Sequence, residues 1–525
     1  MRKKIITTSI VLATVFNMYA GGLLTNTNQN VTFLRNPARD ASTEIDAAYT
    51  NPAGLAFLKK DGFFFSLNNQ SAFQTRTITA DFAPFAGFGG NAVKEFEGEA
   101  KALVIPNLQA AFKTGDWVIS ANIGIVGGGG TLDFSKGLPS FESQVAMLPA
   151  MLSSNGISTN QYSLDSRLKG TQIIYGIQIG ATYKISDNFS AYLGARASIM
   201  NSSYDGYIHN IKANVGGGGL VNVNQYFTAA AQQAQGVASS LQPIIESGAG
   251  GVTLNQLVAF GLLQQAQVDQ MSGGLGMDAG NLTVQQAQGA FTQKAALATG
   301  VADQTADKDL NCKQNGAGVA PIIGFDYNWN GLNIGVKYEF KTVMTLKNKT
   351  TAFPDGMENL DAFKPDASVP NDIPAMLSIG AKYDIIKPLT VSVGYHHFFD
   401  SNARMVDTNN LPKQQYINGG VNEYLVGLEY RINKMFLVSC GTQITRPGLK
   451  DEYFSDMSFD VNSVSFGVGG AIDITKNIRV NLAYLITNYN DRDISFSNYY
   501  DTSLPGKNTY TRTNHCFGIG VDFMF

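Results

Sequence analysis

The chain has 525 residues, only 15% of them charged, and a formal net charge of −3. Soluble α/β proteins carry about 25% charged residues, so the composition argues against that class. The near-zero net charge argues against a nucleic-acid partner, and three scattered cysteines argue against a disulfide framework or a metal site.

Residues 1–20 have the pattern of a secretory signal peptide. Basic residues at 2–4 precede a short apolar run at 5–16, and Ala20 ends a small-residue cleavage site. The run is shorter than the roughly 20 residues that a transmembrane helix needs. No later stretch has about 18 uninterrupted apolar residues. We therefore predict an exported chain without a membrane-spanning helix.

Residues 21–60 follow without the alternation of a strand. They contain Asn51-Pro52-Ala53-Gly54-Leu55, directly before the first alternating segment. Taken alone, Asn-Pro indicates only a turn. A segment of this length before the first strand is suited to fill the interior of a barrel, so we predict an N-terminal hatch over 21–60.

From residue 61 onward, alternating strands recur in pairs that are joined by tight turns. The clearest pair is 172–200, where Ile177 and Leu193 belong to the apolar face and Gln178 to the other. With one strand before and one strand after them, the pairs give fourteen strands. The six turns are predicted at 113–116, 186–188, 328–331, 385–388, 432–434 and 475–477.

The connections between these pairs are much longer, among them 131–165 and 206–317. An even strand count, with short turns at one rim and long loops at the other, is typical of an outer-membrane barrel. We therefore predict an all-β transmembrane fold, a fourteen-stranded antiparallel barrel over 61–525. The chain ends in an apolar alternating strand with terminal Phe525, which resembles the assembly signal of such barrels. We expect the barrel assembly machinery to recognise it.

The inward positions of the predicted strands are unusually small or charged. Fourteen strands enclose more space than their side chains fill. Inward glycines such as Gly335 and Gly427 leave room for a plug or a ligand, unless they serve barrel curvature. Inward charges such as Glu429 and Arg479 are expected to pair with each other or with a plug, because Arg or Lys facing lipid costs about 2–4 kcal/mol.

Three basic residues lie nearer the middle of their strands. Arg196, Lys337 and Lys341 are candidate contacts for a carboxylate head group in the lumen. The alternative is that they form salt bridges within the lumen, with Glu339 and its neighbours.

The two longest loops carry helical patterns. The 206–317 loop is rich in Gly, Ala and Gln and has helical periodicity at about 226–245, 253–271 and 283–300. It is predicted either to capture a hydrophobic ligand outside the barrel or to pack only on itself. Met and Leu suit adaptable apolar binding, although both are also ordinary core residues. The candidate capture residues are Leu254, Leu257, Val258 and Leu262 in this loop, and Met147, Leu148 and Met151 in the 131–165 loop.

The stretch Asn51 to Leu55 resembles the hatch motif of the FadL/TodX-type long-chain fatty-acid transporter family. Residues 426–431 and 518–525 are similar to that family too. The resemblance implies a fourteen-stranded barrel closed by a hatch. It also implies passive uptake of hydrophobic compounds by loop capture, lumen binding and sideways release at a kinked third strand. On this basis Gly127-Gly128-Gly129-Gly130, at the outer end of the third strand, are the candidate lateral opening. A flexible loop start explains them equally.

We therefore predict passive transport of hydrophobic compounds, most of all long-chain fatty acids, across the outer membrane of a Gram-negative bacterium. The alternatives are a general porin for small polar solutes and a structural or adhesive barrel that uses its large loops. No catalytic constellation or metal spacing is found, so we expect neither an enzyme nor a cofactor. The expected partners are the hydrophobic ligand and outer-membrane lipid, without an oligomer.

Overall fold

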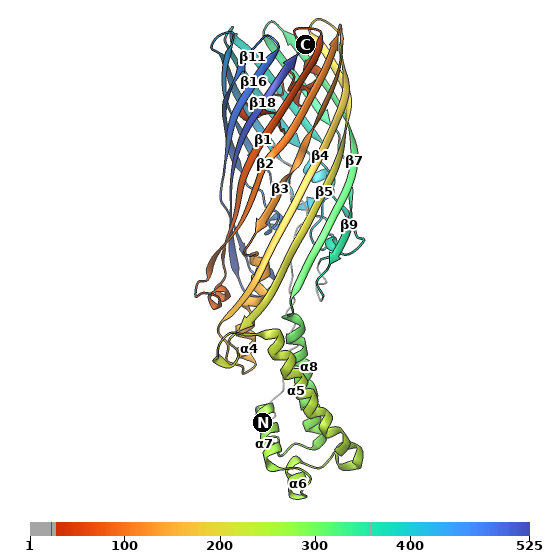
Figure 1. Ribbon diagram of the computed structural model, residues 1–525, viewed down its shortest axis with the longest axis vertical. Coiled ribbons are helices and arrows are strands. Elements are labelled where there is room, and N and C mark those ends of the chain that lie inside the picture. The colour runs from red at the N-terminus through yellow and green to blue at the C-terminus, as the bar shows by residue number, and fades with distance from the viewer. Residues whose placement is uncertain (1–22, 24–27, 356–359) are drawn as a thin grey trace.

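The computed structural model describes residue 23 and residues 28–355 and 360–525. The predicted signal peptide lies outside these residues, as does the start of the predicted hatch. Figure 1 shows a tall barrel with the C-terminus at one rim and a helical extension beyond the other. Among the described helices, none combines the length and the apolar character needed to cross a membrane.

One antiparallel sheet closes on itself. β1 (Gly62–Asp81) pairs with β2 (Val93–Thr114) on one side and with β18 (Gly506–Met524) on the other. Between β2 and β18 the wall runs β3 (Trp117–Phe134), β4 (Tyr162–Lys184), β5 (Phe189–Ala213), β7 (Lys308–Trp329), β8 (Leu332–Glu339) with β9 (Thr345–Ala352), β10 (Ser368–Pro370) with β11 (Met376–Ile386), β12 (Leu389–Phe398), β13 (Asn422–Arg431), β14 (Phe436–Arg446), β15 (Ser463–Asp473), and β16 (Ile478–Tyr489) with β17 (Arg492–Phe496). At some places in the wall two consecutive segments, such as β8 and β9, together form one strand. When each such pair is counted once, the described residues form the predicted fourteen strands.

The six tight turns occur where they were predicted. β4 ends at Lys184 and β5 begins at Phe189, for example, and Ile185 donates its amide to the carbonyl of Phe189 across the turn (2.8 Å). These turns lie at the rim that also holds the C-terminus (Figure 1). In outer-membrane barrels such short turns face the periplasm, so the opposite rim is the extracellular one.

The alternation of side chains sorts apolar residues to the outside. Leu193 has 68% of its side chain exposed, whereas the neighbouring inward Gln178 is 1% exposed. An exterior of this kind would be unstable in water but matches the apolar band of a membrane barrel. Aromatic side chains that are exposed beside the short turns form the predicted interfacial girdle, including Phe112, Trp117, Tyr183, Tyr327, Tyr383, Tyr430 and Phe436.

The large extracellular loop is shorter than the predicted 206–317. β5 continues to Ala213 and β7 begins at Lys308, and the two strands pair as far as Ile208 with Lys308. Above the membrane the outward face of the strands meets water, as at Asp205, and the inward face is buried in a core at the mouth, as at Tyr204 and Ile208, so the lipid-facing apolar alternation that marks a strand in the sequence ends there. The loop proper contains a short strand, β6 (Val221–Asn222), and the helices α5 (Val223–Ile244), α6 (Leu254–Ala259), α7 (Gln265–Leu275) and α8 (Val284–Gln304).

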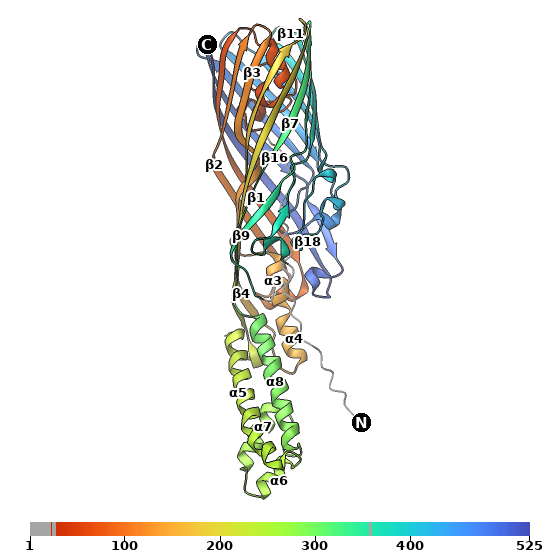
Figure 2. The ribbon, with the colours of Figure 1, turned by 90° about the vertical axis from the view of Figure 1, so that its right-hand side faces the viewer.

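Buried apolar side chains form two main cores outside the membrane. One lies over the mouth of the barrel and includes α3 (Pro139–Ala146) and α4 (Leu148–Ser154), which Figure 2 shows between the barrel and the extension. The other belongs to the extension alone, where Leu241, Leu254 and Phe291 pack together. The extension therefore has a core of its own, and its base, at Phe227 and Val301, joins the core over the mouth.

Candidate functional site

The N-terminal segment forms a hatch inside the barrel. It contains α1 (Val31–Arg35), α2 (Ala47–Thr50) and a 3-10 helix, η1 (Pro52–Phe57), and nearly all of its side chains are buried. Its α1 packs against β15, β16 and β18, and η1 packs against β4, β5 and β7. The described residues of 28–60 thus pack against the inner side of the wall.

Inward glycines give the hatch its room. A Cβ atom on Gly335 would lie 2.2 Å from the backbone oxygen of Asp40, and one on Gly467 would lie 2.0 Å from that of Leu34. Real Cβ atoms do not approach other atoms so closely, so these strand positions must be glycine for the hatch to dock. Added Cβ atoms on Gly380, Gly394, Gly427, Gly441 and Gly518 would also meet hatch atoms, for the most part side-chain atoms, whereas one on Gly469 would first meet the Leu482 oxygen of the wall.

Ion pairs fasten the hatch to the wall. Arg35, fully buried, donates to Glu429 of β13 at 2.8 Å, and Arg479 of β16 reaches Glu44 of the hatch at 2.8 Å. Within the hatch, Arg39 pairs with Asp46 at 2.6 Å. Buried charges are costly unless they are paired, and here each carboxylate lies beside a guanidinium. The inward charges near the periplasmic end thus pair partly with the plug, as predicted.

The Asn51-Pro52-Ala53-Gly54 motif is joined to three neighbouring strands. The Asn51 amide donates to Asp326 of β7 (2.5 Å) and to the carbonyl of Ser42 within the hatch (3.0 Å). The backbone oxygens of Pro52 and Ala53 accept hydrogen bonds from Thr182 of β4 and Ser190 of β5, both at 2.7 Å. A Cβ on Gly54 would lie 2.3 Å from the oxygen of Ser42. The motif therefore combines a turn with specific wall contacts.

The structure separates the three candidate head-group contacts. Arg196 is buried, lies 2.5 Å from Glu339 and stacks over Tyr49 of the hatch, with its guanidinium carbon 4.8 Å from the ring centroid. Lys337 is also buried and donates to the Tyr49 carbonyl (2.9 Å). Lys341 is partly exposed, donates to the carbonyl of Asn402 (3.1 Å) and lies 3.8 Å from Asp372. The alternative of a lumen salt bridge with Glu339 is thus observed for Arg196.

A histidine that the sequence did not single out joins the hatch to the wall. His396 of β12 lies 2.7 Å from Asp40 of the hatch and 2.7 Å from Glu423 of β13, with one ring nitrogen directed to each. Its spacing to the other histidines carries no metal pattern, which is why it was passed over. The signal that could have found it is parity, since residue 396 shares the inward face with Ser392 and Gly394.

Three small cavities follow one another through the lumen. The first, below the mouth, is lined by Met200, Asn371 and Ile373, and the second shares Ile373 with it. The second cavity also contains Arg196 and Glu339 and shares Tyr49 and Met376 with the third, next to the hatch. The Arg196 Nε and the Glu339 Oε2 are buried without a hydrogen-bond partner among the described residues. The interior therefore combines apolar walls with available polar atoms.

The wall is interrupted between β2 and β3. Ala100 pairs with Leu132, and pairing resumes only at Asn107 with Gly124, which leaves 101–106 and 125–131 unpaired with each other. β3 remains attached to β4 there, with two register shifts. The glycines 127–130 lie within this interruption, where Gly128 and Gly130 have φ values of +93° and +72°. Val126, at the same level, lines the second lumen cavity.

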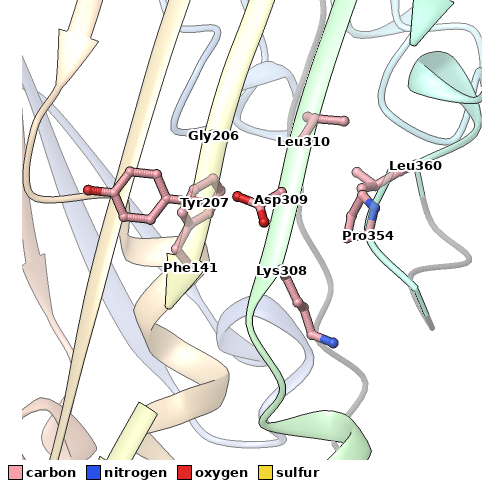
Figure 3. A pocket seen from close by; sticks show the side chains of 8 residues that line it. All are labelled: Phe141, Gly206, Tyr207, Lys308, Asp309, Leu310, Pro354 and Leu360. Atoms are coloured by element: carbon pink, nitrogen blue, oxygen red, sulfur yellow. The ribbon is translucent and has the colours of Figure 1, made fainter. Parts of the chain in front are cut away.

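A further pocket lies at the extracellular rim. Figure 3 shows it between β5, β7 and the segments on either side of residues 356–359. Phe141 and Leu310 give it apolar walls, and Lys308 lies at its side, with Nζ 3.4 Å from the carbonyl of Asp355. It is lined in full by Phe141, Gly206, Tyr207, Lys308, Asp309, Leu310, Pro354 and Leu360.

The candidate capture residues fall into two separate places. Met147, Leu148 and Met151 pack into the core over the mouth, and Leu148 is fully buried. Leu254, Leu257 and Val258 belong instead to the core of the extension, and Leu262 beside them is 67% exposed. Leu254 and Leu257 have almost no accessible surface left to offer a ligand.

Comparison with known proteins finds likeness at the level of structure. No family model and no curated protein matches the sequence. A FadL homologue of Pseudomonas aeruginosa matches with a TM-score of 0.59 and 11% identity, over 96% of this chain and 99% of that one. The toluene transporter TodX of Pseudomonas putida (TM-score 0.49, 15% identity, 97% and 100% covered) and the toluene transporter TbuX of Ralstonia pickettii (0.47, 16%, 95% and 100%) are also similar.

At these identities the likeness establishes the fold, and the comparison with the FadL homologue carries it. The closed barrel, its apolar exterior and its short-turn rim agree with that assignment independently. The chain has the fold of the FadL homologue, a closed outer-membrane β-barrel of Gram-negative type with fourteen strands in its described part.

Proposed function

We propose that this protein carries hydrophobic molecules passively across the outer membrane and releases them sideways through its wall. The observation that carries the proposal is the interruption between β2 and β3, which lies at the level of Val126 in the second lumen cavity. A porin for polar solutes needs an open channel along its axis, and here the hatch fills the periplasmic half. A side exit suits an apolar solute because it leads into hydrocarbon, where each CH₂ group gains roughly 0.8 kcal/mol relative to water.

The route begins at the extracellular side. The rim pocket of Phe141, Leu310 and Leu360 offers apolar surface for a first contact, and the loops over the mouth include the flexible side chains Met147 and Met151. From there the chain of three cavities leads down to the hatch. Desolvation thus proceeds in steps, before the ligand reaches the wall.

The ligand class that we propose is a long-chain carboxylic acid. Lys337 is 2% exposed and lies in the third cavity, and no carboxylate lies within 4 Å of its ammonium group in the described part of the chain. An unpaired ammonium buried in a membrane barrel is costly, so a ligand carboxylate would lower its free energy. Lys308 at the rim pocket offers a first contact of the same charge.

Uptake by cells tests the proposal. Cells that lack their own fatty-acid transporter would receive this gene, and entry of radiolabelled oleate, toluene and arabinose would be compared. We expect oleate entry to depend on the protein and arabinose entry not to. Dependence of arabinose would instead indicate a porin, and independence of all three would favour an adhesive role for the extension.

Lys337→Met tests the ligand class. The variant should slow oleate entry and leave toluene entry unchanged, because only oleate carries a carboxylate. Lys341→Met, which removes a partly exposed lysine that donates to the Asn402 carbonyl and lies 3.8 Å from Asp372, is the control. Equal effects of the two variants, or equal loss of oleate and toluene entry, would exclude Lys337 as the head-group contact.

A further inference from the structure

The β2 side of the wall interruption carries a bulge. Gln70 of β1 pairs with Ile105 and Ala72 pairs with Ala102, so the two residues Leu103 and Val104 lie opposite Ser71 alone. Leu103 and Val104 are 65% and 71% exposed, among the most exposed apolar side chains of the barrel. A bulge bends its strand and increases the local twist. It therefore turns β2 away from its regular course at the level where β3 separates from it.

Two polar side chains on the lipid-facing side of β1 hold this bulge. The Ser71 hydroxyl donates to the Leu103 carbonyl at 2.7 Å, and the Asn69 amide reaches the same oxygen at 3.4 Å. The Asn69 side-chain oxygen accepts from the backbone N–H of Ile105 at 3.1 Å. Asn69 and Ser71 therefore satisfy the backbone groups on both sides of the bulge.

The position of these two residues makes the contacts significant. They share the outward face with Leu67. Across the junction between the first and last strands they pair with Ile519 and Phe517 of β18, both more than half exposed. This is the apolar belt, where an unsatisfied backbone carbonyl costs several kcal/mol. Polar side chains at such positions are unfavourable unless they have a partner, and here the partner is the backbone of the bulge.

We propose that Asn69 and Ser71 are positioning residues that hold the β2 edge of the wall interruption away from β3. The glycines 127–130 make β3 pliable, but they do not keep the edges apart. Pro106, directly above the resumed ladder, has no N–H to donate to β3 and supports the separation. Without the two side chains, the Leu103 carbonyl and the Ile105 N–H, which both face β1, would lose their partners in the apolar belt, and β2 would regain partners by losing the bulge that bends its edge away from β3. The expected effect on transport rests on the lateral release proposed above, whereas the claim that β2 is held away from β3 does not.

A cross-linking experiment tests the geometry without any ligand. Extending the ladder from Asn107 and Gly124 by two residues would pair Ile105 with Val126, so Ile105→Cys and Val126→Cys report on closure. Cys440→Ser removes the exposed native thiol. Oxidation of the purified full-length barrel should cross-link this pair slowly. Adding Asn69→Leu with Ser71→Val should speed it about tenfold, as expected from the loss of two or more hydrogen bonds.

Matched variants distinguish the loss of the Ser71 hydroxyl from a general loss of folding. Ser71→Thr keeps the hydroxyl donor and should behave as the parent. Ser71→Val has the shape of the threonine variant but lacks the hydroxyl. Thr442→Val removes another wall hydroxyl that donates to a neighbouring strand, to the Ser465 carbonyl at 3.0 Å, within an unbroken ladder, and should change nothing. Heat-modifiable migration in gels verifies that each variant is a folded barrel. An equal cross-linking rate in the parent and the Asn69→Leu, Ser71→Val variant would overturn the inference.

Transport is then measured with residues 105 and 126 native. The Asn69→Leu, Ser71→Val variant should close the interruption and lower oleate entry about tenfold, matching its faster cross-linking. Binding of the fluorescent fatty acid cis-parinaric acid to the purified barrel should be unchanged. Faster cross-linking with unchanged oleate entry would support the positioning role of Asn69 and Ser71 and overturn the lateral release of the proposed function, so the two failures are distinguishable.

Discussion

The side-chain oxygen of Asn36 lies 1.7 Å from the point that a Cβ atom on Gly427 would occupy. A side chain at residue 427 would therefore have to push the Asn36 amide out of its buried place, where its nitrogen donates to Ser392 of β12 at 3.3 Å. Gly427→Val should displace the hatch at α1, because overpacking of a filled interior costs typically 1–3 kcal/mol or more. In planar bilayers we expect larger and noisier conductance than for the parent protein.

Gly219→Val is the control for this change. Residue 219 has open space around it, with nothing within 4 Å of an added Cβ. Its conductance should equal that of the parent. A Gly427→Val barrel with parental conductance and melting temperature would contradict the close packing described here.

The hatch motif depends on the direction of one hydrogen bond. Asn51→Asp would place a carboxylate against Asp326, which already accepts from Asn333 at 2.7 Å. Loss of the donor and the new repulsion should speed hydrogen exchange of the hatch amides about tenfold or more. Adding Asp326→Asn reverses the polarity of the pair and should restore part of the protection. Hydrogen exchange followed by mass spectrometry measures both, and no gain in the double variant would show that the contact is not specific.

The Arg196–Glu339 pair should behave as a buried ion pair. Arg196→Met leaves Glu339 buried without its cation, which typically destabilises a protein by about 3–5 kcal/mol. The double variant Arg196→Met with Glu339→Met should recover most of that loss. Thermal unfolding in detergent micelles compares the three proteins. If the single and double variants unfold alike, the two residues are not coupled.

The loops over the mouth should be more stable in acid and resist proteolysis better there. Burial raises the pKa of Asp456 to about 6, and burial likewise raises that of Asp400 to about 6. Asp456 accepts from the Ser140 amide (2.8 Å) and from the Tyr500 hydroxyl. A carboxyl group whose folded pKa exceeds its unfolded value stabilises the fold below the unfolded pKa, and this contribution is lost as pH rises through the folded pKa.

The pH window therefore lies between about 4 and 6. Limited proteolysis at about pH 4.5 should cut the loops more slowly than at about pH 7.5, with an acid-stable and a neutral protease calibrated on unfolded substrate. Asp456→Asn, which cannot ionise, should reduce the difference. Faster loop cleavage in acid would contradict the direction of the shifts.

The helical extension should be removable. The amide of Asn224 donates to the carbonyl of Ala302 at 2.8 Å, so a two-glycine linker can replace residues 225–301. Most of the extension has its own core, but Phe227, Ala231, Ala298 and Val301 at its base pack into the core over the mouth, so the shortened barrel should stay folded with a slightly lower melting temperature. Retained oleate entry would assign capture to the mouth loops and the rim pocket, whereas lost entry would assign it to the extension.

Periodicity was sufficient to predict the barrel because one simple rule, lipid outside and lumen inside, acts on every strand in the membrane. The rule ends where the membrane ends, which is why β5 and β7 extend past the predicted loop boundaries. The lack of strand alternation before residue 61 suggested a segment inside the lumen, but the docking of Asn51 on Asp326 joins residues 275 positions apart. Single-sequence patterns do not contain such pairs, and for the same reason the Asn69 and Ser71 contacts and the bridging His396 were not foreseen.

The seam of the barrel joins its first strand to its last. Phe63 donates its amide to the carbonyl of Phe525 and accepts one from the Phe525 amide, at 3.1 and 2.8 Å. The cylinder can therefore be sealed only after β18 has been exported and has met β1. The hatch precedes β1 in the chain, so it is exported before β18 arrives to close the wall. The order of export therefore places the filling ahead of the closure.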